Sequence, residues 1–429
     1  MKTDICIVGG GPAGAVLALQ LARLDVDVTL LESAQSYERS FRGESMQPDT
    51  VGIFHELGIA ETLLAHGCVE TYRMEISERR RLLLAIDYSD APYRHKFVMD
   101  IPQPVLLEAL QARIADHANA RVLRGAACTG LLERDGRVSG VSYRGHGKSG
   151  EIESRVVIGA DGRYSRVREM SKLPYTKLPM NRDVLWFKVP VPEGWSNHTA
   201  HIMLKGARHL ILLPTYPDLF RAGVNIAKNS FAGQKRQGID AFYTLVDGID
   251  PEFGSHVRRH VANWRDIHLL DIFTINMPSW SRDGLLLIGD AAHTVTPLLG
   301  QGVNLAIQDS MELAPMLANA LCQDRLGSVL FAEFQAKRQP DIEFVMKVQM
   351  RQERLLCAES SWAQFVRRTN YAALHRLRFV QKRISDRIAY KRQRAMLHFD
   401  ECTNNSGMAL ECGFTQTSTV EKQCGVNRS

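Results

Sequence analysis

The chain has 429 residues, of which 45% are hydrophobic and 23% charged, values that are ordinary for a globular protein and exclude a fibre or a disordered chain. The length exceeds that of a single-core domain, so we expect two units with appendages. No apolar run is long enough to span a membrane, and the eight cysteines form no Cys-x-x-Cys pair. The N-terminal apolar run is too short for a signal peptide. We therefore expect a cytoplasmic protein without a metal site.

The net charge of +6 is unevenly distributed along the chain. Residues 351–400 contain twelve Lys or Arg against four Asp or Glu, a net charge of +8, which leaves the rest of the chain near −2. No nucleic-acid-binding motif accompanies this segment, so we expect no nucleic-acid partner. The pattern is typical of a solvated helical face. Attraction to an acidic partner or an anionic membrane surface stays open as the alternative.

The first 32 residues predict a strand, a glycine-rich turn, a helix and a second strand. Within the turn, Gly9 permits a tight bend, Gly11 lets the backbone approach a pyrophosphate, and Gly14 lets the helix pack closely on the strand. The phosphates would lie at the helix N-terminus, where unpaired N–H groups favour anions. Glu32, at the end of the second strand, would accept hydrogen bonds from the ribose hydroxyls. This combination predicts nucleotide binding.

A similar strand, loop and helix pattern occurs much later in the chain. Residues 284–288 are an apolar strand, Asp290 follows its end, residues 294–302 form a loop, and residues 303–321 have helical periodicity. A carboxylate at a strand end suits a sugar or ribityl hydroxyl. The N–H groups that open the helix suit a partial negative charge on a ring oxygen. The two patterns together predict one long dinucleotide ligand.

Five segments occur in the order typical of one flavoprotein family. They are the glycine turn of residues 9–14, Arg42-Gly43-Glu44 before Met46-Gln47-Pro48, Ile101-Pro102-Gln103, Val157-Ile158-Gly159-Ala160-Asp161-Gly162-Arg163, and Gly289-Asp290-Ala291-Ala292-His293 with Pro297 and Gly300-Gln301-Gly302-Val303-Asn304. With this set the chain resembles the FAD-dependent aromatic hydroxylases, the para-hydroxybenzoate hydroxylase-like monooxygenases. The resemblance spans residues 4–321, about three quarters of the chain.

The resemblance implies a set of FAD-binding residues and a transient encounter with NADPH or NADH. The expected FAD contacts are Gly9, Gly11, Pro12, Ala13, Gly14, Glu32, Arg42, Gln103, Asp161, Gly162, Asp290, Gly302, Val303 and Asn304. Pro297, Gly300 and Gln301 are expected next to the flavin ring, and Arg42, Asp161 and Arg168 are candidate nicotinamide contacts. Two alternatives stay open: Arg168 as a helix-surface cation, and Gln103 as a helix-start cap. We expect His293 to be hydrogen-bonded within its turn rather than catalytic.

The expected fold is α/β, with a Rossmann-like FAD-binding domain, an interleaved antiparallel β-sheet substrate domain and a C-terminal helical segment. The FAD-binding domain would comprise residues 1–68, 100–175 and 267–345. The substrate domain would comprise residues 69–99 and 176–266, where alternation predicts strands at residues 184–191, 198–204, 209–214 and 220–226. Five residues are candidates for either the substrate pocket or the core of that sheet: Trp186, Met203, Leu212, Pro214 and Tyr216.

The remaining chain is predicted as a helical region, residues 346–400, and a mobile polar tail, residues 401–429. Apolar and basic residues alternate at helical spacing over residues 371–399. This favours an amphipathic helix packed on the flavin domain. An interfacial membrane helix stays open as the alternative.

The resemblance implies a single-component monooxygenase, monomeric or homodimeric. NAD(P)H would reduce bound FAD, and a flavin hydroperoxide formed with O2 would hydroxylate or epoxidise an aromatic, lipophilic or polyketide-like small molecule. A flavin-dependent halogenase is one alternative, although the Trp-x-Trp-x-Ile-Pro segment expected for it is absent from the sequence. An isoprenoid or double-bond reductase is another, distinguished by its independence of O2. A flavin-binding partner protein without turnover is the third.

Overall fold

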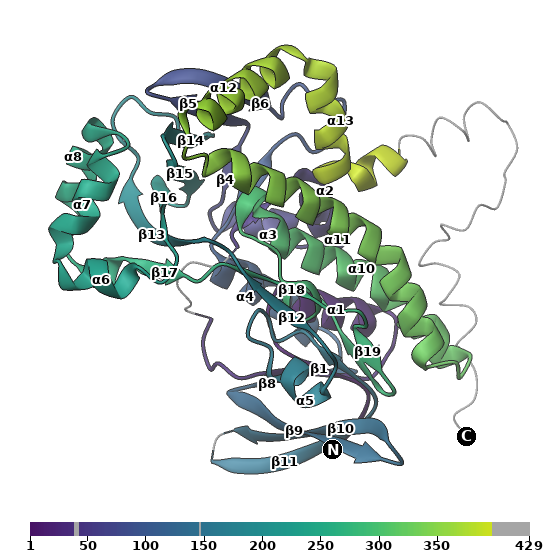
Figure 1. Ribbon diagram of the computed structural model, residues 1–429. Helices are drawn as coiled ribbons and strands as arrows, with labels where there is room; N and C mark the ends of the chain where they lie inside the picture. The colour runs from purple at the N-terminus through teal and green to yellow at the C-terminus, as the bar shows by residue number, and fades with distance from the viewer. Residues whose placement is uncertain (38–42, 146, 397–429) are drawn as a thin grey trace, which may run out of the picture.

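A mixed sheet of eight strands forms the centre of the first unit. The computed structural model describes residues 1–37, 43–145 and 147–396 (Figure 1). The sheet order is β19-β20-β11-β1-β2-β8, with β10 and β9 added to the N-terminal part of β11. Its strands are β1 (Lys2–Val8), β2 (Val28–Glu32), β8 (Ala120–Arg124), β9 (Ala126–Arg134), β10 (Arg137–Gly145), β11 (Lys148–Gly159), β19 (Ser281–Arg282) and β20 (Leu285–Leu287).

The strands β20, β11, β2 and β8 run parallel to β1, as expected of a Rossmann-like fold. β2 is buried along its whole length, because helices cover the sheet and apolar residues occupy both faces. The first unit contains α1 (Pro12–Arg23), α2 (Pro48–Glu56), α3 (Ala60–Ala65), α4 (Gln103–Ala115), α5 (Arg166–Ser171), α9 (Asp290–His293) and α10 (Gln301–Cys322). The expected α/β fold class is confirmed.

A seven-stranded sheet dominates the second unit, in the order β17-β13-β16-β15-β14-β5-β6. Neighbours are antiparallel except β14 and β5. The strands are β5 (Arg73–Glu78), β6 (Arg81–Asp87), β13 (Arg182–Pro190), β14 (Thr199–Lys205), β15 (Arg208–Thr215), β16 (Leu219–Ala227) and β17 (His268–Leu270). The four strands predicted from alternation are confirmed, each within two residues of its expected ends.

The prediction was incomplete for residues 231–260, which form the helices α6 (Phe231–Arg236), α7 (Ile239–Asp247) and α8 (Pro251–His260). The helices α7 and α8 lie beside one face of the sheet, its outer face (Figure 1). Phe242 of α7 and Phe253 of α8 share a core there with Phe187 and Leu212. The opposite, inner face carries Trp186 and other apolar side chains toward the first unit. Two small sheets link the units: β3 (Ser45–Met46), β7 (Val98–Asp100) and β4 (Val69–Thr71), and β12 (Thr176–Pro179) with β18 (Phe273–Asn276).

The C-terminal helices differ from the expectation in two respects. α11 (Ser328–Leu356) runs without a break across the expected 345/346 division. The single helix expected over residues 371–399 is corrected to α12 (Ser361–Arg376) and α13 (Arg378–Ile388). Leu377 between them has a φ of −88° and a ψ of 67°, and the Gln381 side chain donates to the Leu374 carbonyl at 2.9 Å, which satisfies a carbonyl at the end of α12. Residues 397–429, including the expected tail, lie outside the described residues.

A buried arginine fixes α12 on the seven-stranded sheet. Arg367 is fully buried, contacts Glu78 of β5 at 2.6 Å and donates to the carbonyls of Gly206 at 2.7 Å and Leu356 at 3.3 Å. Arg368 contacts the other Glu78 oxygen, also at 2.6 Å, but its side chain is 49% exposed. The same carboxylate therefore has one buried and one exposed cationic partner.

We expect Arg367→Ala to lower the free energy of unfolding by about 3 kcal/mol, because it leaves a buried carboxylate oxygen and two carbonyls without their donor. Arg368→Ala is the matched control and should lower it by less than about 1 kcal/mol, since an exposed ion pair is screened by water. Urea unfolding of the two variants measures the difference. Equal losses would contradict the assignment of Arg367 as the anchor of α12.

Candidate functional site

The turn between β1 and α1 leaves open space at the start of the helix. Gly9 has a φ of 111°, and a Cβ at Gly14 would lie 1.9 Å from the Gly9 carbonyl oxygen, so both positions require glycine. A Cβ at Gly11 would meet no atom within 4 Å. Gly11 is also the residue before the helix and provides no side-chain cap. Because the first N–H groups of a helix lack intrahelical partners, this space suits an anion such as a pyrophosphate.

Glu32 lies at the end of β2, beside this turn. Its Oε2 accepts a hydrogen bond from the Gly10 N–H at 2.9 Å, and its Oε1 accepts one from the Ala34 N–H at 2.7 Å. The residue is 3% exposed. These two backbone bonds orient the Glu32 carboxylate beside the start of α1.

Asp309 of α10 fixes the second glycine turn, which begins at Gly289. The Asp309 Oδ2 accepts from the Gly289 N–H at 2.9 Å and lies 2.6 Å from the His293 Nε2, and the Oδ1 accepts from Arg338 at 2.8 Å. Burial alone would raise the pKa of Asp309, but His293 and Arg338 lower it to about 2. The His293 ring is thus hydrogen-bonded, and its partner is Asp309 of α10 rather than a residue of its own turn.

The loop that enters α10 has an unusual backbone. Leu299 and Gly300 are both left-handed, with φ values of 64° and 60°. The Gln301 side chain donates to the Leu299 carbonyl at 3.0 Å, and Gln349 of α11 donates to the Leu298 carbonyl at 2.7 Å. A leucine in the left-handed region is strained and persists only where its surroundings hold it. Such strain is concentrated at functional sites.

The Asn304 side chain is occupied by protein contacts. Its Oδ1 accepts from the Gln47 N–H at 2.8 Å and from the Thr50 hydroxyl at 2.6 Å. Its Nδ2 donates to the carbonyls of Ser45 at 3.1 Å and Gly300 at 2.7 Å. These four bonds fix the start of α10 against residues 45–50. The backbone of the first turn of α10, rather than the Asn304 side chain, is therefore the part available to a ligand.

The start of α1 lies against the second glycine turn and the third turn of α10. The Ser310 hydroxyl of α10 donates to the Ala13 carbonyl of α1 at 2.7 Å, and a Cβ built at Gly289 would lie 3.6 Å from the Ala13 Cβ. The first residue of α10, Gln301, precedes Ser310 by nine residues, about 14 Å along the helix. A Cβ at Gly302, in the first turn of α10, would lie 3.7 Å from the Asp290 Oδ1. A single elongated ligand can therefore reach from the start of α1 along the second glycine turn to the start of α10.

The Asp-Gly segment is organised by the start of α5. Asp161 accepts from the N–H groups of Arg166 at 2.7 Å and Val167 at 3.0 Å, and burial raises its pKa. Arg168 is 3% exposed and donates to the Ala291 carbonyl at 2.9 Å. Arg168 is therefore not the helix-surface cation allowed as an alternative, and its guanidinium supports the second glycine turn. Gly162 has a φ of 83° and open space around it.

Gln103 is the first residue of α4, and the residue before it, Pro102, provides no side-chain cap. The Gln103 side chain instead lies toward the Gly43 carbonyl, with Nε2 3.4 Å from the oxygen. It therefore reaches the segment that follows Arg42, and the helix-cap alternative does not describe its contacts. Arg42 itself lies outside the described residues.

A buried polar cluster that sequence reasoning missed joins the two units. Arg221 of β16 lies 3.1 Å from Glu44 and donates to the Ser45 hydroxyl at 3.0 Å. Ser45 and Thr71 both donate to Asp100, and burial raises the pKa of Asp100 to about 6 against the opposing effect of Arg221 and the two hydroxyls. A signal was present, because Glu44 and Asp100 are charged residues inside or beside two of the flavin segments.

The candidate pocket residues separate between the two faces of the sheet. Met203 and Leu212 belong to the core under α7 and α8, and Tyr216 is exposed at the end of β15. Pro214 is buried. Trp186 lies on the inner face, where its indole covers Gly223: a Cβ there would lie 2.9 Å from the ring. Of the five, Trp186 thus lies on the inner face, and the Tyr216 ring contacts the first unit, since a Cβ at Gly67 after α3 would lie 2.5 Å from it.

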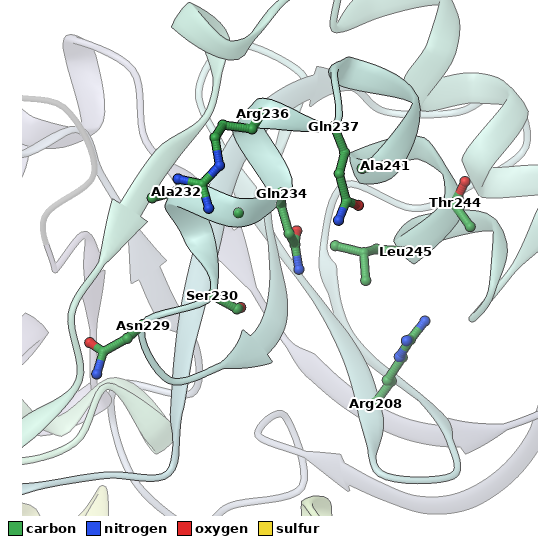
Figure 2. Close-up of a pocket in the computed structure, with 11 residues that line it drawn as sticks. Arg208, Asn229, Ser230, Ala232, Gln234, Arg236, Gln237, Ala241, Thr244 and Leu245 are labelled. Atoms are coloured by element: carbon green, nitrogen blue, oxygen red, sulfur yellow. The ribbon is translucent and has the colours of Figure 1, made fainter.

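A separate cavity of about 650 Å³ lies between α6, α7 and the start of β15 (Figure 2). Arg208, Gln234 and Thr244 line it. Arg208 lies on the same face of β15 as Leu210 and Leu212, because side chains two residues apart in a strand share a face. Leu210 and Leu212 belong to the outer-face core. This cavity is therefore on the side of the sheet away from the glycine turns. In the described part of the chain no group of His, Cys, Asp or Glu is arranged to hold a metal ion.

Comparisons with known proteins agree with this geometry. The family model of an FAD binding domain matches residues 2–349. A 6-methylpretetramide 4-monooxygenase of Streptomyces rimosus is 34% identical over 366 residues, which cover 85% of this chain and 87% of the relative.

Two solved structures have the same fold. A p-nitrophenol 4-monooxygenase of Pseudomonas putida DLL-E4 has a TM-score of 0.78 at 17% identity and covers 89% of this chain and 96% of its own. A flavin-dependent brominase has a TM-score of 0.76 at 16% identity and covers 94% of this chain and 100% of its own. The length of the family match and the identity to the Streptomyces rimosus relative show that the chain belongs to the FAD-dependent aromatic hydroxylase family.

Proposed function

We propose that this FAD-dependent monooxygenase consumes NAD(P)H and O2 to hydroxylate or epoxidise a flat, polycyclic aromatic or polyketide-like small molecule. The observation that carries the proposal is the packing of the α1 start on the third turn of α10, through the Ser310 to Ala13 hydrogen bond of 2.7 Å, while the loop before α10 packs on the inner face of the seven-stranded sheet through Leu298. One end of this arrangement suits a dinucleotide, and the other adjoins an apolar wall.

The residues of the two turns fit FAD. The open start of α1 at Gly11 would hold the pyrophosphate, and Glu32 the adenosine ribose. Asp290 would accept from the ribityl hydroxyls. The N–H groups of residues 302–304 would stabilise negative charge on the pyrimidine edge of the flavin. FAD, when bound, supplies hydride acceptance from NAD(P)H and activation of O2, while the protein orients the partners and excludes water.

The substrate would lie against the inner face of the sheet. Trp186, Ile211 and Leu213 form an apolar surface there, and Leu298 of the strained loop packs into a neighbouring apolar cluster on the same face. Arg221, whose guanidinium lies 5.6 Å from the centroid of the Trp186 ring, borders this surface and is paired with Glu44. A flat aromatic skeleton suits this apolar surface. The relative named as a 6-methylpretetramide 4-monooxygenase supports this choice of substrate class.

The first test is anaerobic addition of NADPH or NADH to the FAD-loaded protein, with and without a panel of phenols and polycyclic aromatics. We expect flavin absorbance to bleach, faster with a panel member that is a substrate, and admission of O2 to yield a product with one added oxygen atom. Mass spectrometry identifies the product. Failure to bleach under every condition would reject direct reduction by NAD(P)H and favour a halogenase served by a separate reductase.

Gly11→Ala tests the pyrophosphate position. The new methyl group would enter space that is open in the protein but adjoins the α1 N–H groups, so we expect FAD affinity to fall about tenfold or more. Gly327→Ala is the matched control, because a Cβ there also meets no atom within 4 Å. Fluorescence titration of the ligand-free proteins with FAD measures both affinities. Unchanged affinity for Gly11→Ala would place the phosphates elsewhere.

Asp290→Ala tests the ribityl contact. We expect FAD affinity to fall by about tenfold, since a charge-assisted hydrogen bond contributes roughly 1.5–3 kcal/mol. Asp283→Ala, an exposed carboxylate in the lead-in to β20, is the control and should bind FAD normally. If Asp290→Ala retained FAD and turned over at the unmodified level, the role given to Asp290 would be rejected.

A further inference from the structure

Large apolar side chains are exposed on the two C-terminal helices. Trp362 is 72% exposed, Phe365 54% and Phe379 70%. Leu377 and Ile384 are exposed beside them. We call these five residues, together with the cations Arg376, Lys382 and Arg383, the α12–α13 patch. Scattered exposed apolar residues are normal in proteins, but a group of this size on adjacent helices marks an interaction surface.

One stripe of α12 carries much of the patch. Trp362 and Phe365 are followed at helical spacing by Thr369, Ala373 and Arg376, all of them exposed. The Trp362 and Phe365 rings are stacked with centroids 5.7 Å apart. The opposite side of α12 is buried on β5 and β6 through Arg367 and Tyr371. The helix is thus held in place by one face while it presents the aromatic face to solvent, at the outer edge of the molecule (Figure 1).

The patch is also strongly cationic. Residues 361–396 contain ten Lys or Arg and a single acid, Asp386, which is buried and accepts a hydrogen bond from the Tyr93 hydroxyl at 2.8 Å. Arg376, Lys382 and Arg383 are exposed and, within residues 1–37, 43–145 and 147–396, have no carboxylate at ion-pair distance. Five other cations of the segment pair with carboxylates elsewhere in the protein: Arg367, Arg368, Arg378, Lys391 and Arg392. Arg376, Lys382 and Arg383 face solvent.

We infer that the α12–α13 patch docks the enzyme on the surface of an anionic lipid bilayer. Tryptophan and phenylalanine gain by burial at the boundary between headgroups and acyl chains, and nearby cations are attracted to acidic headgroups. A second copy of the chain is disfavoured as the occupant, because a two-fold contact would place the cations of both patches against each other. No helix among the described residues is long and apolar enough to cross a membrane, so the contact is peripheral.

The test is flotation of the FAD-loaded full-length protein with vesicles of phosphatidylcholine alone or of an equimolar mixture with phosphatidylglycerol, at low and high salt. We expect binding to the anionic vesicles only, and its loss at high salt because the attraction is screened. Two double variants separate the contribution of the aromatic side chains from that of the cations. Trp362→Ser with Phe379→Ser removes aromatic area, and Lys382→Ala with Arg383→Ala removes two cations.

Each variant has a matched control elsewhere on the surface. Val329→Ser removes an apolar side chain that is 73% exposed at the start of α11, and Lys235→Ala with Arg236→Ala removes an adjacent exposed cation pair on α6. We expect the aromatic pair to lower partitioning by about tenfold or more. The cation pair should lower it about 30-fold, at about 1 kcal/mol for each charge and 1.4 kcal/mol for each tenfold change. Both controls should bind like the unmodified protein.

Several outcomes would overturn the inference. Equal binding to neutral and anionic vesicles, or equal losses in patch and control variants, would reject the patch as the docking surface. Absence of vesicle binding, with a dimer in sedimentation velocity that Trp362→Ser with Phe379→Ser abolishes, would assign the patch to self-association. Binding to duplex DNA or to RNA instead of vesicles, lost in Lys382→Ala with Arg383→Ala, would assign it to nucleic acid. Retained flavin absorbance and circular dichroism identify the variants that fold.

Discussion

The candidate flavin site depends on one buried carboxylate. Asp309 receives the Gly289 N–H on one oxygen, together with the His293 ring, and the Arg338 guanidinium on the other. These bonds join the second glycine turn, α10 and α11. A buried charge is tolerated only when it is paired and hydrogen-bonded. The Asp309 carboxylate therefore requires the second glycine turn, α10 and α11 to keep one fixed relative position. That arrangement sets the second glycine turn and α10 against the start of α1, where FAD is proposed to bind.

A second set of buried charges couples the flavin side to the sheet. Arg221 lies on β16, yet its partner Glu44 belongs to the segment of Arg42, and Ser45 follows that segment. Asp100 comes directly before the segment of Gln103. Arg221 therefore connects the inner face of the sheet to both segments at once. Placing a substrate wall near the flavin requires such a bridge, because the two units have separate hydrophobic cores.

The C-terminal helices contribute in a different way. α11 reaches the strained loop through Gln349, whose side chain donates to the Thr296 and Leu298 carbonyls at 2.9 and 2.7 Å. α12 is then fixed on the seven-stranded sheet by Arg367. The same segment of chain thus supports the proposed flavin loop at one end and presents the cationic, aromatic surface at the other. Support and surface exposure coexist because α11 contacts the loop, while α12 buries one face on the sheet and exposes the other.

The sequence by itself determined the local features: the glycine turns at Gly9 and Gly289, the acid at Glu32, and the alternating strands. Each of these depends on residues close together in the chain. Only the tertiary structure decided the partner of Arg221 and the burial of Arg168. A buried charge is stabilised by groups that folding brings from distant segments, and the residues next to it in the sequence do not indicate which groups these are. The sequence pattern of apolar and basic residues likewise allowed one long C-terminal helix, and packing divided it in two.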